Sequence, residues 1–227
     1  MPTERFMRLP EAKKRAIWKA AFDEFSRTKM DKVSINRIIQ EAEISRGSFY
    51  TYFEDKWDLL DYLLGTMQMS IQNSAAVKRV LKHADIWEWL DGLFEGILEF
   101  FRVPENLEFI RNFCSSVGTA DVILKDGHFS PKYFNGKERE FDEEFDKAYQ
   151  RSARDGGLIS LTCREMDTFK EFCKFSLGKA VTDAIKGTEE GEIKRDFAVR
   201  MNFLRRSVER KKGDISSTTH DLKVTGL

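Results

Sequence analysis

The sequence predicts an all-α protein of about nine helices. Apolar residues recur at helical spacing through most of the chain, and side chains that typically cap helix N-termini precede several of these runs. Alternating β-branched runs, which indicate strands, are absent. The four prolines, at positions 2, 10, 104 and 131, leave long uninterrupted segments for helices.

The N-terminal part predicts one long helix followed by two very short ones. Pro10 suits a first helical turn, and the apolar residues after it indicate a helix over 10–27. Three further capping residues then follow within 22 positions: Ser34, Ser45 and Asp55. They predict helices over 35–42, 46–51 and 55–73. Two short helices joined by a tight turn and held by longer ones form a helix-turn-helix arrangement.

The rest of the chain predicts a helical bundle. Asp85 caps a helix that runs to Arg102 and is apolar around most of its circumference, so we expect it to lie centrally. Further helices are expected over 105–117, 137–154, 163–186 and 190–210, with a loop or short irregular helix over 118–136. These elements divide the chain into a helix-turn-helix domain (1–54), a bundle (55–210) and a disordered tail (211–227).

Composition excludes several classes of protein. The 227 residues are 41% hydrophobic, enough for a core, but no apolar run of about 18 residues spans a membrane and no signal peptide is visible, so we expect a cytoplasmic protein. Net charge is zero, whereas residues 1–50 carry eleven Lys and Arg against seven Asp and Glu. This mild basic excess is compatible with nucleic-acid binding and equally with a solvated helix face.

Motifs of an enzyme are missing. The sequence has no Gly-rich phosphate loop, no HExxH and no Cys/His metal spacing, and His83, His128 and His220 are scattered. We therefore predict no catalytic residue, no metal and no cofactor. Gly92 and Gly96 have the spacing of a helix-packing contact. The three cysteines are interpreted as buried free thiols, and Cys163 and Cys173 as packing residues, with a redox switch as the alternative.

The first 60 residues resemble the DNA-binding domain of the tetracycline-repressor (TetR) family. The resemblance rests on an ordered set of residues: Ile17, Ala20, Ala21, Phe25, Ser34, Ile38, Ala42, Ile44, Ser45, Gly47, Phe49, Tyr50, Tyr52, Phe53, Lys56, Leu59 and Leu60. The sequence departs from the family at Lys29 and Glu43, where glycine is usual, and at Ile39, where alanine is usual. Glu43 falls in the turn between the short helices, where a left-handed backbone costs a non-glycine residue roughly 1 kcal/mol.

The resemblance implies that the helix after Ser45 enters the major groove of DNA by its N-terminal end. Arg46 has the donors to bind guanine O6 and N7 together, and Gly47 lets the backbone approach the duplex. Phe49 and Phe53 are expected in the core. Lys56 adds its charge to the positive end of the next helix, a favourable phosphate site. The predicted DNA-binding residues are Ser34, Asn36, Ser45, Arg46, Gly47, Ser48, Tyr50, Tyr52 and Lys56.

The family resemblance further implies a homodimer, formed through the last two helices, that reads a palindromic operator and responds to a small molecule. Candidate dimer residues are Phe169, Phe172, Phe175, Leu177, Ala180, Phe203 and Leu204. Crowded aromatics could line a pocket for a hydrophobic or aromatic effector, although each alone is more commonly core: Trp87, Trp89, Phe94, Phe101, Phe109 and Phe113. The predicted function is a ligand-responsive transcriptional repressor. The alternative is a protein-interaction module on the same fold that uses DNA as a platform.

Overall fold

The computed structural model describes residues 2–29, 32–80, 84–116, 137–154 and 157–210. Within these ranges the chain forms eleven α-helices. They are α1 (Glu4–Met7), α2 (Glu11–Arg27), α3 (Ile35–Glu41), α4 (Arg46–Tyr52), α5 (Lys56–Gln72), α6 (Ala75–Val80), α7 (Ile86–Phe101), α8 (Pro104–Ser116), α10 (Lys137–Arg154), α11 (Cys163–Lys186) and α12 (Glu190–Val208).

The all-α fold is confirmed, and each of the nine predicted helices is present. The short helices α1 and α6 were not predicted. The segments predicted as a loop (118–136) and as a disordered tail (211–227) lie outside the described residues. No helix in the described ranges is long and apolar enough to cross a membrane.

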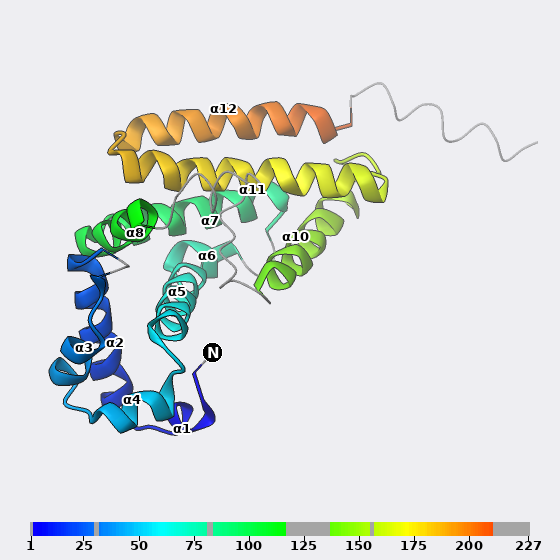
Figure 1. Ribbon diagram of the computed structural model, residues 1–227. Coiled ribbons are helices and arrows are strands. Elements are labelled where there is room, and N and C mark those ends of the chain that lie inside the picture. Colours follow the sequence, from blue (N-terminus) through cyan, green and yellow to red (C-terminus); the bar gives the residue numbers. More distant parts are fainter. Residues whose placement is uncertain (1, 30–31, 81–83, 117–136, 155–156, 211–227) are drawn as a thin grey trace, which may run out of the picture.

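Figure 1 shows an elongated molecule with α1–α4 at one end and the paired helices α11 and α12 as a layer at the other. Between them α7 lies beneath α11, and α5 extends from the α1–α4 end toward the bundle. The start of α7 is fixed by a capping box between Asp85 and Glu88. The predicted central position of this helix is confirmed: most of its residues are buried, and both hydrophobic cores of the protein include part of it.

The first hydrophobic core continues across residue 54, the boundary expected from the sequence. It unites α1–α5 with α8, whose Phe109 stacks on Phe22 of α2 with ring centroids 5.3 Å apart. Asn112 of α8 also donates a hydrogen bond to the carbonyl of Ser26, at the end of α2. The second core lies among α7, α10, α11 and α12. The helix-turn-helix is therefore packed directly against α8 of the bundle.

The helix-packing interpretation of Gly92 and Gly96 is confirmed. A Cβ atom at Gly92 would lie 2.4 Å from Val80 Cγ2, and one at Gly96 would lie 2.8 Å from the hydroxyl of Ser74. Real Cβ atoms essentially never come so close, so both positions require glycine for α6, and for Ser74 just before it, to pack against α7.

The interpretation of all three cysteines as buried thiols is wrong for one of them. Cys114 and Cys173 are buried. Burial raises the pKa of the Cys114 thiol to about 11, and it raises the pKa of the Cys173 thiol more than that of Cys114. Both thiols are thus protonated and unreactive at neutral pH. Cys163 is exposed at the first residue of α11, where it packs against no core.

Candidate nucleic-acid interface

Helices α3 and α4 begin where the predicted capping residues stand. The Ser34 hydroxyl accepts the backbone N–H of Arg37, and the Ser45 hydroxyl accepts that of Ser48 at 3.0 Å. Between the two helices Glu43 has φ 51°, the left-handed backbone expected of this turn. The caps thus define where the two short helices begin, and the left-handed residue Glu43 forms the turn between them.

One face of α4 anchors it in the first core. Phe49 and Phe53 are fully buried, as predicted. Phe53 packs against Phe6 of α1, with ring centroids 4.8 Å apart. The N-terminal segment is also hydrogen-bonded to this C-terminal end of α4, since Thr3 donates from its backbone N–H to the Tyr52 carbonyl and from its hydroxyl to the Thr51 carbonyl. With this face buried, the opposite face of α4 is directed outward.

Arg46 and Tyr50 on the outward face of α4 form a group with Asn36 of α3, and all three are predicted site residues. Arg46 Nη1 donates a hydrogen bond of 2.7 Å to Asn36 Oδ1 of α3, and its guanidinium lies 5.6 Å from the centre of the Tyr50 ring. All three residues are exposed. The structure therefore joins the starts of the two short helices through polar side chains at the surface.

Other predicted contact residues lie on α4, at its N-cap and on α5. The hydroxyls of Ser45 and Ser48 are 2.8 Å apart. Lys56, in the first turn of α5, lies with its Nζ 5.3 Å from the Trp57 ring. Tyr52 differs from the others because it packs against the first core, with its ring 6.0 Å from that of Phe6. Because its ring packs against the core, the Tyr52 side chain has less freedom to contact DNA than the exposed residues have.

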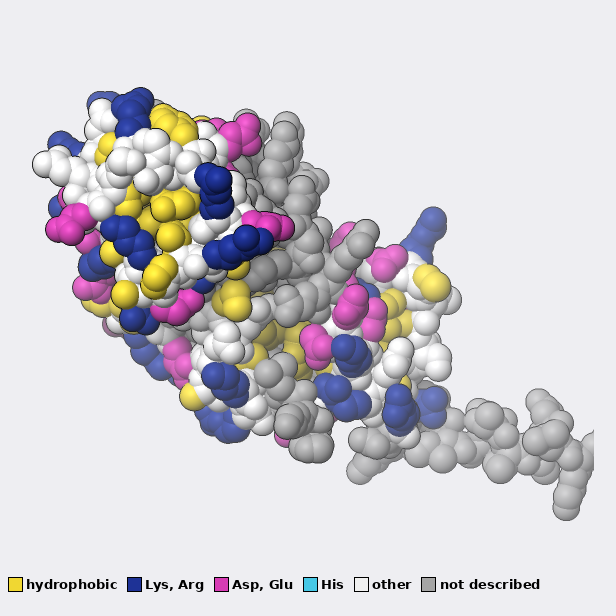
Figure 2. Space-filling view, turned by 90° about the horizontal axis from the view of Figure 1, so that it is seen from below, with side chains coloured by type: hydrophobic (Ala, Val, Ile, Leu, Met, Phe, Trp, Pro, Cys, Tyr) yellow, Lys and Arg dark blue, Asp and Glu magenta, His cyan; other side chains and the backbone are white. Residues whose placement is uncertain are grey.

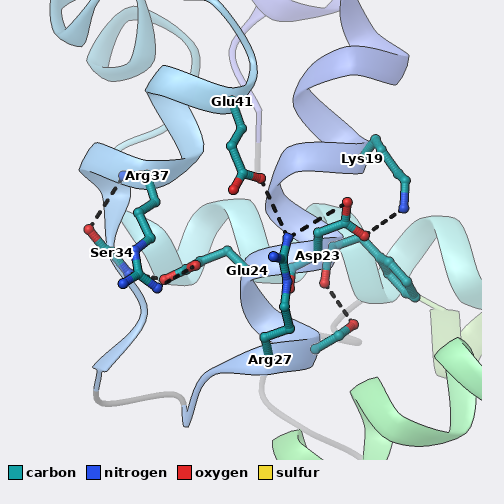
Figure 3. Close-up of polar contacts among 9 residues, drawn as sticks. Lys19, Asp23, Glu24, Arg27, Ser34, Arg37 and Glu41 are labelled. Carbon is teal, nitrogen blue, oxygen red and sulfur yellow. Dashed lines mark hydrogen bonds and ion pairs between the residues drawn. The ribbon is translucent and has the colours of Figure 1, made fainter.

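Charged residues between α2 and α3 were missed by the sequence analysis. Glu24 of α2 is 2% exposed, and its Oε1 accepts the backbone N–H of Ser34 at 2.9 Å. Its Oε2 lies 3.6 Å from Nη1 of Arg37, as Figure 3 shows. Nothing in the sequence distinguishes a buried glutamate on this helix from an exposed one. The carboxylate fixes the start of α3 against α2.

Lys and Arg side chains are spread over the end of the molecule that contains α1–α4. Figure 2 views this end from below, and the basic side chains there surround a patch of uncharged polar and apolar groups, with some Asp and Glu among them. Such a surface is compatible with contacts to phosphates at its edge and to bases at its centre.

The six aromatic residues predicted as an effector pocket are not brought together. Phe101, Phe109 and Phe113 belong to the first core, whereas Trp87, Trp89 and Phe94 belong to the second. In the second core Trp89 lies 5.1 Å from the Phe141 ring. The separation follows from α8 packing on α2, which places Phe109 and Phe113 in the first core together with Phe101 at the end of α7, away from the other α7 aromatics.

The predicted dimer residues are likewise divided between two faces. Four of them face the second core and are buried: Phe169, Leu177, Ala180 and Leu204. Phe172, Phe175 and Phe203 are exposed, at 55%, 49% and 76%, and Val199 beside them is 67% exposed. These four exposed residues line an open groove of about 770 Å³ between α11 and α12. An apolar face of this kind on a helix pair is unusual unless it is covered by a partner.

Comparison with known proteins connects this geometry to a family. Residues 17–63, which contain α3, α4 and most of α2, match the family model described as bacterial regulatory proteins, tetR family. No curated protein sequence matches the chain.

Solved structures of TetR-family regulators are similar over nearly the whole chain. A TetR family transcriptional regulator from Chloroflexus aurantiacus J-10-FL is 23% identical, with a TM-score of 0.52 over 93% of this chain and 100% of that one. The flavonoid-responsive regulator FrrA is 16% identical, with a TM-score of 0.60 over 89% and 100%. A TetR-like transcriptional regulator from Rhodococcus sp. RHA1 is 16% identical, with a TM-score of 0.55 over 88% and 98%.

At these identities the structural likeness establishes the fold, and the family model matches the segment that contains α3 and α4. In this chain the matched segment comes first and the helical bundle follows it, and α4 is the second helix of the helix-turn-helix. Residues 17–63 thus match the DNA-binding part of the TetR family, and the chain as a whole has the fold of solved TetR-family regulators.

Proposed function

We propose that this protein is a homodimeric repressor that binds a palindromic operator through α4 and leaves it when a small hydrophobic or aromatic effector binds. The observation that carries the proposal is the outward face of α4, where Arg46 and Tyr50 stand exposed at the end of the molecule farthest from α11 and α12.

The chemistry of this face suits the major groove. Arg46 lies in the first turn of α4, the part of a recognition helix that approaches base edges, and its guanidinium matches guanine O6 and N7. Gly47 follows it, and a Cβ there would meet only the Ser45 hydroxyl, at 3.8 Å. Since nothing in the described part of the chain requires glycine at this position, close approach of the backbone to DNA is a reason for it. Ser34, Ser45, Ser48 and Lys56 are proposed to contact the sugar–phosphate backbone.

The proposed dimer forms through the groove lined by Phe172, Phe175, Val199 and Phe203. Pairing this face with its copy would bury four exposed apolar side chains from each protomer. Two recognition helices in such a dimer are expected about 34–36 Å apart, one turn of DNA. A palindromic operator mirrors the two-fold symmetry of the dimer.

The proposed effector site lies in the second core, because its aromatic rings come from three helices. Trp87 and Trp89 of α7 pack there with Phe145 of α10 and Phe169 of α11. The similarity to a flavonoid-responsive regulator makes flavonoids a reasonable first class of compound to test. Binding at this core would reach the DNA-binding end through α7 and α8, and couplings of this kind are typically worth about 1–3 kcal/mol.

The proposal is tested by replacing Arg46. In full-length protein, Arg46→Ala should weaken binding to the operator by about 1–3 kcal/mol per half-site and relax the base preference at one position in each half-site. Fluorescence anisotropy with labelled duplexes measures both effects. Unchanged affinity and unchanged preference would show that α4 is not the reading helix.

The alternative function is a protein-interaction module that uses DNA as a platform. The apolar groove between α11 and α12 would favour this function if a different protein occupied it. The oligomeric state of the purified protein separates the two. A stable homodimer fills the groove with a second copy, whereas a monomer leaves it for a different partner.

A further inference from the structure

The Arg46 side chain is held on two sides by residues of different helices. Its Nη1 donates to Asn36 Oδ1, 2.7 Å away on α3, and the guanidinium lies 5.6 Å from the Tyr50 ring, one turn further along α4. A free arginine at a protein surface samples many rotamers. Here an amide and an aromatic face restrict it before any ligand binds.

The hydrogen bond to Asn36 uses only part of what the guanidinium offers. Arginine has five N–H donors in a planar fork and no acceptor. One hydrogen of Nη1 is used by Asn36, so the edge formed by Nε and Nη2 remains complete. That edge is able to donate two parallel hydrogen bonds, which is what guanine O6 and N7 accept in the major groove.

The partner also determines how the amide of Asn36 is oriented. Because a guanidinium can only donate, the amide atom that faces it must be the oxygen. One lone pair of the Asn36 oxygen therefore accepts from Arg46, and the Nδ2 of Asn36 remains as a donor. Adenine is recognised by asparagine through both amide atoms together, whereas the amide oxygen of Asn36 is directed at Arg46.

We propose that Asn36 is a positioning residue that orients Arg46 toward one guanine in each half-site, so that the two helices of the helix-turn-helix read this base pair as a unit. The inference rests on the proposed function, since it requires that α4 enters the major groove. It gives a specific role to Asn36, which the sequence analysis included among the DNA-binding residues.

A purely structural role for the Asn36–Arg46 bond predicts different behaviour. Both side chains are exposed, and hydrogen bonds at the surface contribute little to folding because water replaces them. Loss of Asn36 should therefore leave the fold intact. Preorganisation acts instead on binding, by lowering the ordering cost of Arg46 when it meets the base.

The test compares the wild-type protein with Asn36→Ala, Arg46→Ala and the double variant, all as full-length chains. Each is titrated against an operator obtained by selection from random duplex DNA. Each is also titrated against the same duplex in which adenine replaces the guanine whose preference depends on Arg46. The measured quantity is the ratio of the two affinities. Arg46→Ala should lower this ratio about tenfold or more, which is the size of a lost bidentate contact.

Coupling between the residues is the expected result. Asn36→Ala should remove most of the guanine preference although Arg46 is present, and the double variant should be no worse than Arg46→Ala. Asn36→Asp keeps an acceptor for Arg46, so it should retain the preference while its added charge weakens binding to all duplexes. Gln40→Ala, at another exposed position of α3, is the control and should behave as wild type.

Two results would overturn the inference and are distinguishable. If Arg46→Ala loses the guanine preference but Asn36→Ala keeps it, or if the two effects multiply independently, Asn36 does not position Arg46 and the proposed function stands. If the wild-type protein binds no duplex in preference to others, the proposed function fails and the inference fails with it.

Discussion

Lys13 of α2 donates a hydrogen bond from its ammonium group to the backbone carbonyl of Glu43, 2.9 Å away, and its Nζ lies 3.2 Å from the carbonyl of Ala42. These carbonyls lie at the end of α3, where a helix leaves its last acceptors without partners. A lysine there satisfies them and places positive charge at the negative end of the helix. It holds the turn in place although Glu43 has φ 51°.

The strain at Glu43 predicts a stabilising substitution. Glu43→Gly should raise the free energy of unfolding by about 1 kcal/mol relative to Glu43→Ala, because only glycine adopts this backbone without a Cβ penalty. Both variants lose the same exposed carboxylate and both keep the carbonyl that Lys13 contacts. Chemical denaturation of the two variants measures the difference. Equal stabilities would mean that the turn is not strained by its side chain.

Gly92 predicts the opposite result inside the bundle. Gly92→Ala places a methyl group against the stiff Val80 side chain and should lower the free energy of unfolding by about 1–3 kcal/mol. Gly65→Ala in α5 is the matched control, since a Cβ there meets nothing within 4 Å. The control should gain up to about 1 kcal/mol from helix propensity. A gain in both variants would mean that α6 does not pack closely on α7.

The exposed face of α11 and α12 predicts where the dimer can be broken. Phe203→Glu introduces a charge into the proposed interface and should give a monomer at concentrations where the wild-type protein is a dimer. Folding should be unaffected, because Phe203 is 76% exposed in the protomer. Sedimentation velocity reports the mass, and circular dichroism the fold.

Met69→Glu serves as its control, since Met69 is also apolar and exposed but lies on α5. The control should remain a dimer and should bind the operator as the wild type does. Phe203→Glu should bind more weakly because each half-site is then engaged separately. A dimeric Phe203→Glu protein would place the interface elsewhere.

Lys56 is expected to act on DNA without regard to sequence. Lys56→Ala should weaken binding to operator and to random duplexes by similar factors and reduce the slope of log affinity against log salt by about 1 per protomer. Titrations between about 0.05 and 0.2 M salt measure this slope. A loss confined to the operator would instead assign Lys56 a role in base recognition.

Glu190 predicts a dependence of stability on pH. Its hydrogen bond to Arg102, reinforced by Lys194, lowers its pKa from 4.5 to about 2 and joins the start of α12 to the end of α7. A carboxyl whose pKa is lowered by folding stabilises the protein above its unfolded pKa. That contribution disappears as the pH falls from about 4.5 toward about 2.

Glu190→Gln should flatten the loss of unfolding free energy over this interval, whereas Glu192→Gln, in the same helical turn, should leave it nearly unchanged. Denaturation at a series of acidic pH values gives both curves. Parallel curves for Glu190→Gln and the wild type would show that the ion pair does not contribute in solution.

Most of the fold could be predicted from the sequence because local signals agree with it. The predicted capping residues Ser34, Ser45, Asp55 and Asp85 accept hydrogen bonds from backbone N–H groups at the starts of their helices, and helical periodicity indicated the helix lengths. Helix α1 was not predictable in this way. It is four residues long, and its position depends on Phe6 in the core and on Thr3 bonds to residues 51 and 52.

Helical periodicity could not predict which apolar face of a helix packs into the core and which remains exposed. Phe169 and Phe172 are three residues apart on one helix, yet the first is buried and the second is exposed. Both faces of α11 are apolar, so the sequence gives no reason to prefer either as the core. The same limit applies to the aromatics of α7 and α8, whose partners are decided by how α8 packs on α2. Buried Glu24 and the Asn36–Arg46 bond depend likewise on tertiary contacts.

The central claim is that two copies of α4 read a palindrome, and selection of binding sites from random duplex DNA tests it most directly. The purified full-length protein is used at about 0.1–0.15 M salt, where specific and non-specific binding separate. The account predicts an enriched palindromic motif with half-site centres about 10 base pairs apart. A folded, dimeric protein that enriches no motif would contradict it.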